Sequence, residues 1–123
     1  MASNESPTQL LLTIAEPTRL RILNCLTAAP LFVSDLQAIL GLPQPTVSRH
    51  LTVLRKAGLV RDTPIAQFVL YRVRREGGPQ GRLLQAILDA IGHDEVMRAE
   101  RHRALDRNRT HTRSQFPAMA REF

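Results

Sequence analysis

The chain has little of the chemistry that would support an enzyme or a thiol-based metal site. Its single cysteine, Cys25, cannot form an intrachain disulfide and offers one thiol per subunit. No glycine-rich phosphate loop is present, and no Ser/His/Asp or Cys/His arrangement has a supporting context. A catalytic role has no residues on which to rest, so we predict that the protein is not an enzyme.

Long apolar runs are missing as well. No stretch approaches the ~18 apolar residues that span a bilayer, and the N-terminal MASNESPTQ lacks the basic-then-apolar pattern of a secretory signal. We therefore expect a cytoplasmic protein. The length of 123 residues suits one domain with a modest core. We assign residues 1–109 to that domain and residues 110–123, which have little periodicity, to a flexible C-terminal tail.

Positive charge is abundant and comes almost entirely from arginine. The formal net charge is +6 and the isoelectric point is near 11.2, with Lys56 as the sole lysine. Basic side chains release counterions when they neutralise phosphates, so nucleic acid is the natural partner. Seven of the sixteen arginines lie from Arg98 onward, however, and part of this charge serves solubility instead.

The most informative segment is 44–60, QPTVSRHLTVLRKAGLV. Pro45 suits the first turn of a helix and Gly58 the position after its end, which predicts a helix over 45–57. Val47, Leu51 and Leu54 fall at helical spacing and should face a core. The other positions carry amide, hydroxyl and guanidinium groups, which hydrogen-bond to base edges and phosphates. An ordinary amphipathic helix is the alternative interpretation.

The flanking segments favour DNA reading. Residues 34–40 predict a short helix with Ser34 or Asp35 near its cap, and Gly41 with Leu42-Pro43 predicts a tight turn. Downstream, 59–63 and 68–74 are rich in β-branched and aromatic residues and predict a β-hairpin that turns at 64–67. Helix, turn, helix and hairpin in this order predict a mainly α fold with a small β-hairpin, a winged helix-turn-helix.

Residues from about Glu16 to Arg75 resemble the ArsR/SmtB family of bacterial dimeric repressors. The resemblance rests on EPTRLRIL, VSDLQ, QPTVSRHLTVLRKAGLV and LYRV. It implies a winged-helix homodimer that binds a palindromic operator and leaves it when an inducer binds. It also implies that the first and last helices form the dimer interface.

Three further segments read as helical. Residues 8–15 predict a first helix that is apolar on more than one side, and Pro17 starts a second that runs to about Thr27. After Gly77-Gly78-Pro79, residues 82–91 carry an apolar stripe at helical spacing. With the resemblance, this pattern predicts a dimer interface, although each helix alternatively packs only on its own domain. The predicted interface residues are Leu10, Leu11, Ile14, Leu83, Leu84, Ile87, Leu88 and Ile91.

The segment from His93 to Arg109 is densely charged and predicts a solvated helix. Pairs four residues apart, Asp94 with Arg98 and His102 with Asp106, would support it. This helix either continues the dimer helix or restarts after Gly92.

The inducer is not evident. Soft metalloid sensing requires several thiolates, and family members that sense such ions carry Cys-Val-Cys-Asp-Leu where this chain has Phe32-Val33-Ser34-Asp35-Leu36. Both cysteine positions are lost, and Cys25 reads as a buried core residue. A zinc-type site would draw on Asp89, His93, His102 and Asp106, but their spacing departs from the family pattern, so we predict no metal cofactor. An organic inducer or loss of sensing remains open.

We assign DNA roles by position. Base reading falls to Gln44, Thr46, Ser48 and Arg49, and phosphate anchoring to His50, Thr52, Arg55 and Lys56. For His50, packing against the wing is an equal alternative. The wing tip offers only Gln67 as a polar side chain, so wing contact with DNA is doubtful. The function this predicts is a homodimeric transcriptional repressor. The alternative is a protein-interaction module on the same scaffold.

Overall fold

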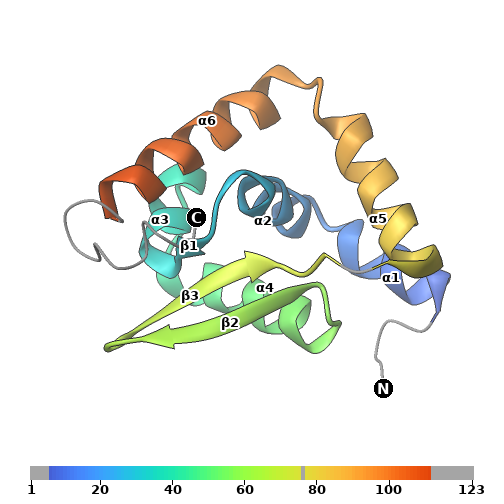
Figure 1. Cartoon of the computed structure of the whole chain (residues 1–123), viewed down its shortest axis with the longest axis horizontal. Helices are drawn as coiled ribbons and strands as arrows, with labels where there is room; N and C mark the ends of the chain where they lie inside the picture. The colour runs from blue at the N-terminus through green and yellow to red at the C-terminus, as the bar shows by residue number, and fades with distance from the viewer. Residues whose placement is uncertain (1–5, 76, 112–123) are drawn as a thin grey trace.

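The computed structural model describes residues 6–75 and 77–111, which form six helices and three strands (Figure 1). The helices are α1 (Pro7–Ile14), α2 (Pro17–Ala28), α3 (Val33–Leu40), α4 (Gln44–Lys56), α5 (Gly78–Ile91) and α6 (Glu95–Thr110). The strands are β1 (Leu31–Phe32), β2 (Val60–Ile65) and β3 (Phe68–Val73). The predicted mainly α fold with a hairpin is confirmed. From residue 112 onward, the predicted tail lies outside the described residues.

The first two helices begin with side-chain caps followed by proline. The Ser6 hydroxyl accepts a hydrogen bond from the Gln9 amide at 3.3 Å, and the Glu16 carboxylate accepts one from the Arg19 amide at 2.9 Å. These caps satisfy amides that the first helical turn leaves unpaired, and proline, which lacks an N–H, costs nothing there. The observed bounds lie within one residue of those predicted.

The sheet is antiparallel, in the order β1-β3-β2, and β2 and β3 form the wing. The predicted position of the hairpin turn was wrong. Pro64 and Ile65 belong to β2, so the turn consists of Ala66 and Gln67, and Ala66 takes φ 56° to close it. The sequence also did not predict β1, because two residues are too short to show an alternating pattern.

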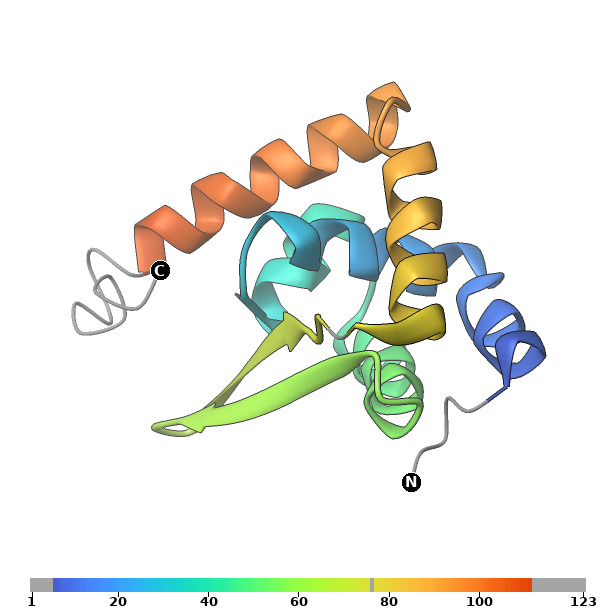
Figure 2. The same ribbon diagram turned by 45° about the vertical axis from the view of Figure 1, so that its right-hand side comes forward.

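Helix α2 lies at the centre of the molecule, between α6 on one side and the sheet with α4 on the other (Figures 1 and 2). Its Ile22, Leu23 and Cys25 are fully buried in one apolar core. The helices of the helix-turn-helix add Leu36, Ile39, Val47, Leu51 and Leu54 to the same core. The apolar side of α4 is therefore part of the same core as α2, and this packing holds the polar side of α4 in place.

The C-terminal third contains two separate helices. Helix α5 begins at Gly78, four residues before the predicted start. Gly78 takes the left-handed φ of 84°, which glycine permits, and Pro79 fits the first turn. Of the two predicted alternatives after Gly92, the restart is correct: the Asp94 side chain caps α6 by accepting from the Met97 amide at 2.9 Å. Among the described residues, no helix is both long and apolar enough to cross a membrane.

Helix α6 is not simply solvated, as its charge density had predicted. It packs against α2 and α3, and it buries Ala104 and Glu100. The predicted pairing of His102 with Asp106 is replaced by a pair between Asp106 and Arg109, whose closest atoms are 3.6 Å apart. The prediction failed because α6 docks mainly through polar groups, which leave no apolar stripe in the sequence.

Candidate nucleic-acid interface

Helix α4 holds most of the predicted DNA-contacting residues, and its core side is fixed. Val47, Leu51 and Leu54 are fully buried. Of the predicted side chains, five are exposed and three are half-buried. The exposed ones are Gln44, Arg49, Thr52, Arg55 and Lys56, and the half-buried ones are Thr46, Ser48 and His50. The buried stripe and the polar positions predicted from the sequence are thus found where expected.

Three of these polar residues already form hydrogen bonds with one another. The Gln44 amide donates from Nε2 to the Ser48 hydroxyl at 2.7 Å, and the Thr52 hydroxyl donates to the Ser48 carbonyl at 3.0 Å. Such contacts restrict side-chain rotamers before any ligand arrives, which lowers the entropy lost on binding. Within the part of the chain that the structure describes, the Arg49 side chain makes no such hydrogen bond, and it is exposed.

The end of α4 sets where the wing starts. Gly58 takes φ 79°, its amide donates to the Arg55 carbonyl at 3.0 Å, and the Leu59 amide reaches back to the Leu54 carbonyl at 2.9 Å. This left-handed closure favours glycine and satisfies carbonyls at the helix end. It leads the chain directly into β2, so the wing is placed by backbone geometry.

The wing lies beside the start of α4. A cavity of about 410 Å³ separates them, and its lining includes Gln44 and Ser48 of α4 and Gln67 and Phe68 of the wing. Gln67 is exposed at the tip, as predicted. Farther along, the pKa of Tyr71 is raised by burial and also by the paired Asp62, while Arg55 of α4 acts in the opposite direction.

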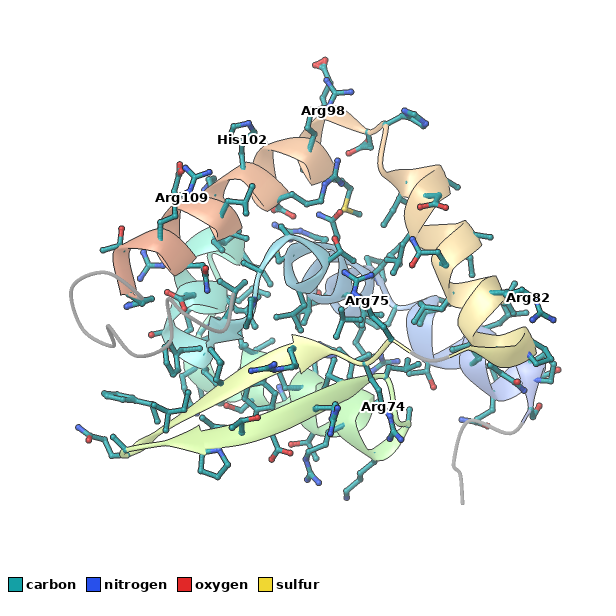
Figure 3. All side chains as sticks on the ribbon, in the orientation of Figure 1. Arg74, Arg75, Arg82, Arg98, His102 and Arg109 are labelled. Carbon is teal, nitrogen blue, oxygen red and sulfur yellow. The ribbon has the colours of Figure 1, made fainter. Side chains whose placement is uncertain are left out.

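The strand arginines spread in different directions. Arg61 and Arg72 stand directly opposite each other on the two strands of the wing, and such a pairing of like charges is unfavourable by itself. Arg75 instead donates to the Thr27 carbonyl of α2 at 3.2 Å. Figure 3 shows Arg74 below the end of β3 and Arg82 on the outer side of α5.

His50 does not lie on the wing side of α4, so the alternative that it packs against the wing is wrong. Two helical residues turn the direction of a side chain by about 200°, and Ser48 is the one that lines the cavity beside the wing. His50 lies beside α2, with its Nδ1 atom 3.5 Å from Nη1 of Arg19. The sequence analysis did not identify Arg19, because nothing local indicates a contact between residues 31 positions apart.

Helix α3 braces α4 and ends at Leu40, and its C-cap Gly41 takes φ 70°, as the predicted turn requires. Its N-cap is Phe32, two positions before Ser34, the nearer of the two predicted candidates. Asp35 is fully buried and accepts a hydrogen bond from the Phe32 amide at 2.8 Å. Arg107 Nε donates to Asp35 at 2.7 Å, and His111 Nε2 lies 2.6 Å from the same oxygen.

Asp35 belongs to a row of polar contacts between α6 and the body of the protein, which we call the polar seam. It comprises the pairs Arg21–Glu100, Asn24–Met97, Asn24–Arg101, Ala38–Arg103, Pro30–Asn108, Asp35–Arg107 and Asp35–His111. In this chain, the position of the family's second cysteine, Ser34, is exposed, and the neighbouring carboxylate is occupied by α6.

The predicted dimer residues divide into two groups. Leu10, Ile14, Leu84 and Leu88 are buried within the chain itself. Leu11 is 47% exposed, while Leu83, Ile87 and Ile91 are half-buried. The unpredicted Leu12 is 63% exposed. Helices α1 and α5, which carry these residues, lie near each other at one end of the molecule (Figure 2). Their accessible apolar side chains therefore occur in one region.

The four candidate residues for a metal site are spread over α5, the linker that follows it, and α6. Asp89 and His93 are exposed and help to line a cavity of about 420 Å³ between α2, α5 and α6. His102 lies on the outer side of α6 (Figure 3), and Asp106 pairs with Arg109. Within residues 6–75 and 77–111, no three His, Cys, Asp or Glu side chains lie close enough together to hold a metal ion.

Cys25 is a core residue, as predicted. It is fully buried in α2, and this burial, reinforced by the nearby Glu100 carboxylate, raises its pKa to about 12. The thiolate is the reactive and metal-binding form of cysteine. At neutral pH this thiol is protonated, so it is unsuited to sensing by direct metal binding or oxidation.

An exposed polar helix braced by a second helix and followed by a β-hairpin defines the winged helix-turn-helix class. A family profile described as "Bacterial regulatory protein, arsR family" matches residues 16–62. The chain belongs to the ArsR family of bacterial regulatory proteins, as the sequence resemblance predicted.

Individual relatives agree with this assignment. The chain is 35% identical over 85 residues to the HTH-type transcriptional repressor SmtB of Mycobacterium tuberculosis, which covers 69% of this chain and 59% of that protein. It is 38% identical over 90 residues to the HTH-type transcriptional regulator CmtR of Mycobacterium bovis, covering 72% and 75%. The matched part thus spans about three fifths of SmtB. These relatives are transcriptional regulators, not enzymes.

The fold also resembles a solved structure. The transcriptional repressor BigR from Xylella fastidiosa superposes with a TM-score of 0.61 at 28% identity, covering 72% of this chain and 85% of that one. The winged-helix arrangement is therefore common to both.

Proposed function

We propose that this protein is a DNA-binding transcriptional repressor that acts as a homodimer on a palindromic operator. The observation that carries the proposal is the polar side of α4, held rigidly because Val47, Leu51 and Leu54 on its opposite side are fully buried. A helix that presents amide, hydroxyl and guanidinium groups from a rigid scaffold suits the major groove.

Within this proposal, Gln44, Thr46, Ser48 and Arg49 read base edges from the first half of α4. Thr52, Arg55 and Lys56 anchor phosphates from its second half, where all three are exposed. Gln67 at the wing tip lies across the cavity from Gln44 and Ser48, so a DNA strand held against α4 would pass near it. His50 faces α2, where its Nδ1 atom lies 3.5 Å from Nη1 of Arg19.

The partner that we propose for α1 and α5 is a second copy of the chain. Leu11 and Leu12 are large exposed apolar residues, and Leu83, Ile87 and Ile91 are accessible in part. A symmetric dimer uses the same patch twice. Pairing through this end would place two copies of α4 on one duplex, where half-sites lie about 34 Å apart. We further propose that the dimer acts in the cytoplasm and is released by a small-molecule or ion inducer.

Fluorescence anisotropy with a duplex from the protein's own promoter, across a series of salt concentrations, tests DNA binding. Arg49→Ala should cost about 1–3 kcal/mol of binding free energy on the promoter duplex and less on a random-sequence duplex. Arg98→Gln is the matched control, because it removes one charge from the outer side of α6, remote from α4 (Figure 3).

Unchanged affinity in Arg49→Ala would refute base reading by α4. Absence of salt-dependent duplex binding by the unaltered protein would refute DNA binding altogether and favour the protein-interaction module.

A further inference from the structure

The side of α4 that faces away from the wing contains a pair of polar side chains, His50 and Arg19. His50 is half-buried on this side, and Arg19 approaches it from α2. Arg19 is the third residue of α2, so the pair joins the helix that reads DNA to the helix at the centre of the core. Its position beside an exposed polar helix makes it a candidate for binding an anion.

Arg19 is held at three atoms. Its backbone amide donates to Glu16 Oε1 at 2.9 Å, and its Nε donates to the Thr13 carbonyl at 2.7 Å. Its Nη1 then lies 3.5 Å from His50 Nδ1. Since Thr13 is in the last turn of α1, the guanidinium also satisfies a carbonyl at a helix C-terminus, where positive charge is favourable. The side chain is thereby fixed before any DNA binds.

The chemistry of the two groups decides which nitrogen of His50 carries a proton. A guanidinium has only donors and stays charged. Opposite Arg19, Nδ1 must therefore be the acceptor, and the neutral imidazole carries its proton on Nε2. That N–H is on another edge of the ring and remains available as a donor.

We propose that Arg19 and His50 together bind one phosphate of the DNA backbone on the side of α4 opposite the wing. Arg19 supplies charge and fixes the tautomer, and His50 donates from Nε2. The inference rests on the proposed DNA binding and adds a second line of phosphate contact. Arg55 and Lys56 hold one strand from the exposed end of α4, and Arg19 and His50 hold the backbone from its other side.

Binding to a random-sequence DNA duplex tests the pair without knowledge of the operator, because a phosphate contact is independent of sequence. Arg19→Met keeps an unbranched side chain but removes all donors. We expect it to lower affinity roughly ten-fold, as for a lost charge-assisted hydrogen bond. The slope of log K against log salt concentration should fall by about 0.9, the value for one phosphate. Arg98→Gln is the matched control.

Two substitutions of His50 separate its two nitrogens. Gln places its amide group near the position of Nε2, and Asn places it near that of Nδ1. We expect His50→Gln to retain duplex affinity within about three-fold and His50→Asn to lose roughly ten-fold, because only the first keeps an outward donor. Nitrogen-15 NMR of the imidazole should show a proton on Nε2 in the unaltered protein and a mixture of tautomers in Arg19→Met.

Three results would each refute phosphate binding by Arg19 and His50. One is unchanged affinity and salt slope in Arg19→Met with thermal unfolding showing an intact fold. Another is equal affinity of His50→Gln and His50→Asn, and the third is a proton on Nδ1 of the unaltered protein. If Arg49→Ala weakens promoter binding while Arg19→Met changes nothing, only this inference fails. If the unaltered protein binds no duplex, both proposals fail.

Discussion

Helices α4 and α6 are both rich in charge, yet they are held in place by different forces. Helix α4 packs through Val47, Leu51 and Leu54, and it leaves its polar side chains to the exterior. Helix α6 buries little apolar material and packs through the polar seam, including the buried carboxylates of Asp35 and Glu100. Apolar packing leaves polar groups available for a ligand, whereas polar packing consumes them.

We expect the largest loss of stability from a substitution on the apolar side of α4. Leu51→Ala removes a fully buried side chain that anchors the helix to the core. We expect the free energy of unfolding to fall by about 2–5 kcal/mol, from lost burial and the cavity left behind. Urea denaturation measures it. A loss below that of a surface substitution such as Thr52→Ala would show that α4 is not held by its apolar side.

A smaller effect is expected in the polar seam. Asp35→Ala leaves the buried Phe32 amide without its acceptor, while Arg107, whose side chain is 39% exposed, can turn to water. The unsatisfied amide should lower the free energy of unfolding by about 1–3 kcal/mol. Hydrogen exchange should increase at the start of α3 and the end of α6. Unaltered exchange at both places would contradict the importance of this contact.

Cys25 is a probe of the contact between α2 and α6. Its side chain lies on α2 near Glu100 of α6 and near three arginines, Arg21 of α2 and Arg101 and Arg103 of α6. Its pKa of about 12 in the folded state exceeds the usual value of 9.0, since burial disfavours the thiolate. The folded state therefore retains the proton more strongly. This contribution to stability is complete below pH 9 and is lost as the pH rises toward 12.

The measurement is the difference in free energy of unfolding between the unaltered protein and Cys25→Ala as a function of pH. It should be constant below pH 9 and should decline above it. A second readout is alkylation, which should be slow in the folded protein and faster in Asp35→Ala if α6 detaches locally. Rapid alkylation of the unaltered protein at neutral pH would contradict a buried thiol.

The smallest effect should come from the exposed charges of α6. Asp106 and Arg109 form an ion pair with a closest distance of 3.6 Å, and both side chains are more than half exposed. Asp106→Asn should change the free energy of unfolding by less than about 1 kcal/mol, because water and salt screen such pairs. Thermal unfolding would detect a larger loss, which would place Asp106 among the contacts that hold α6.

The same contrast explains what the sequence could predict. Periodicity identified α4 because Val47, Leu51 and Leu54 recur at helical spacing, and proline and glycine marked its ends. It did not predict that α6 folds back on α2, since Glu100 and Arg107 are indistinguishable in sequence from solvated charges. Arg19 was missed for a related reason: its three contacts depend on where α1, α2 and α4 meet, which no local pattern specifies.

The short strand β1 has a mechanical consequence. Leu31 and Phe32 pair with Tyr71 and Leu70 of β3, and the chain enters α3 at the next residue, Val33. Because no loop intervenes, we expect a force applied at the wing tip to be transmitted through the ladder to the start of α3. The wing and the bracing helix should then tilt together as one lever when DNA presses on the tip.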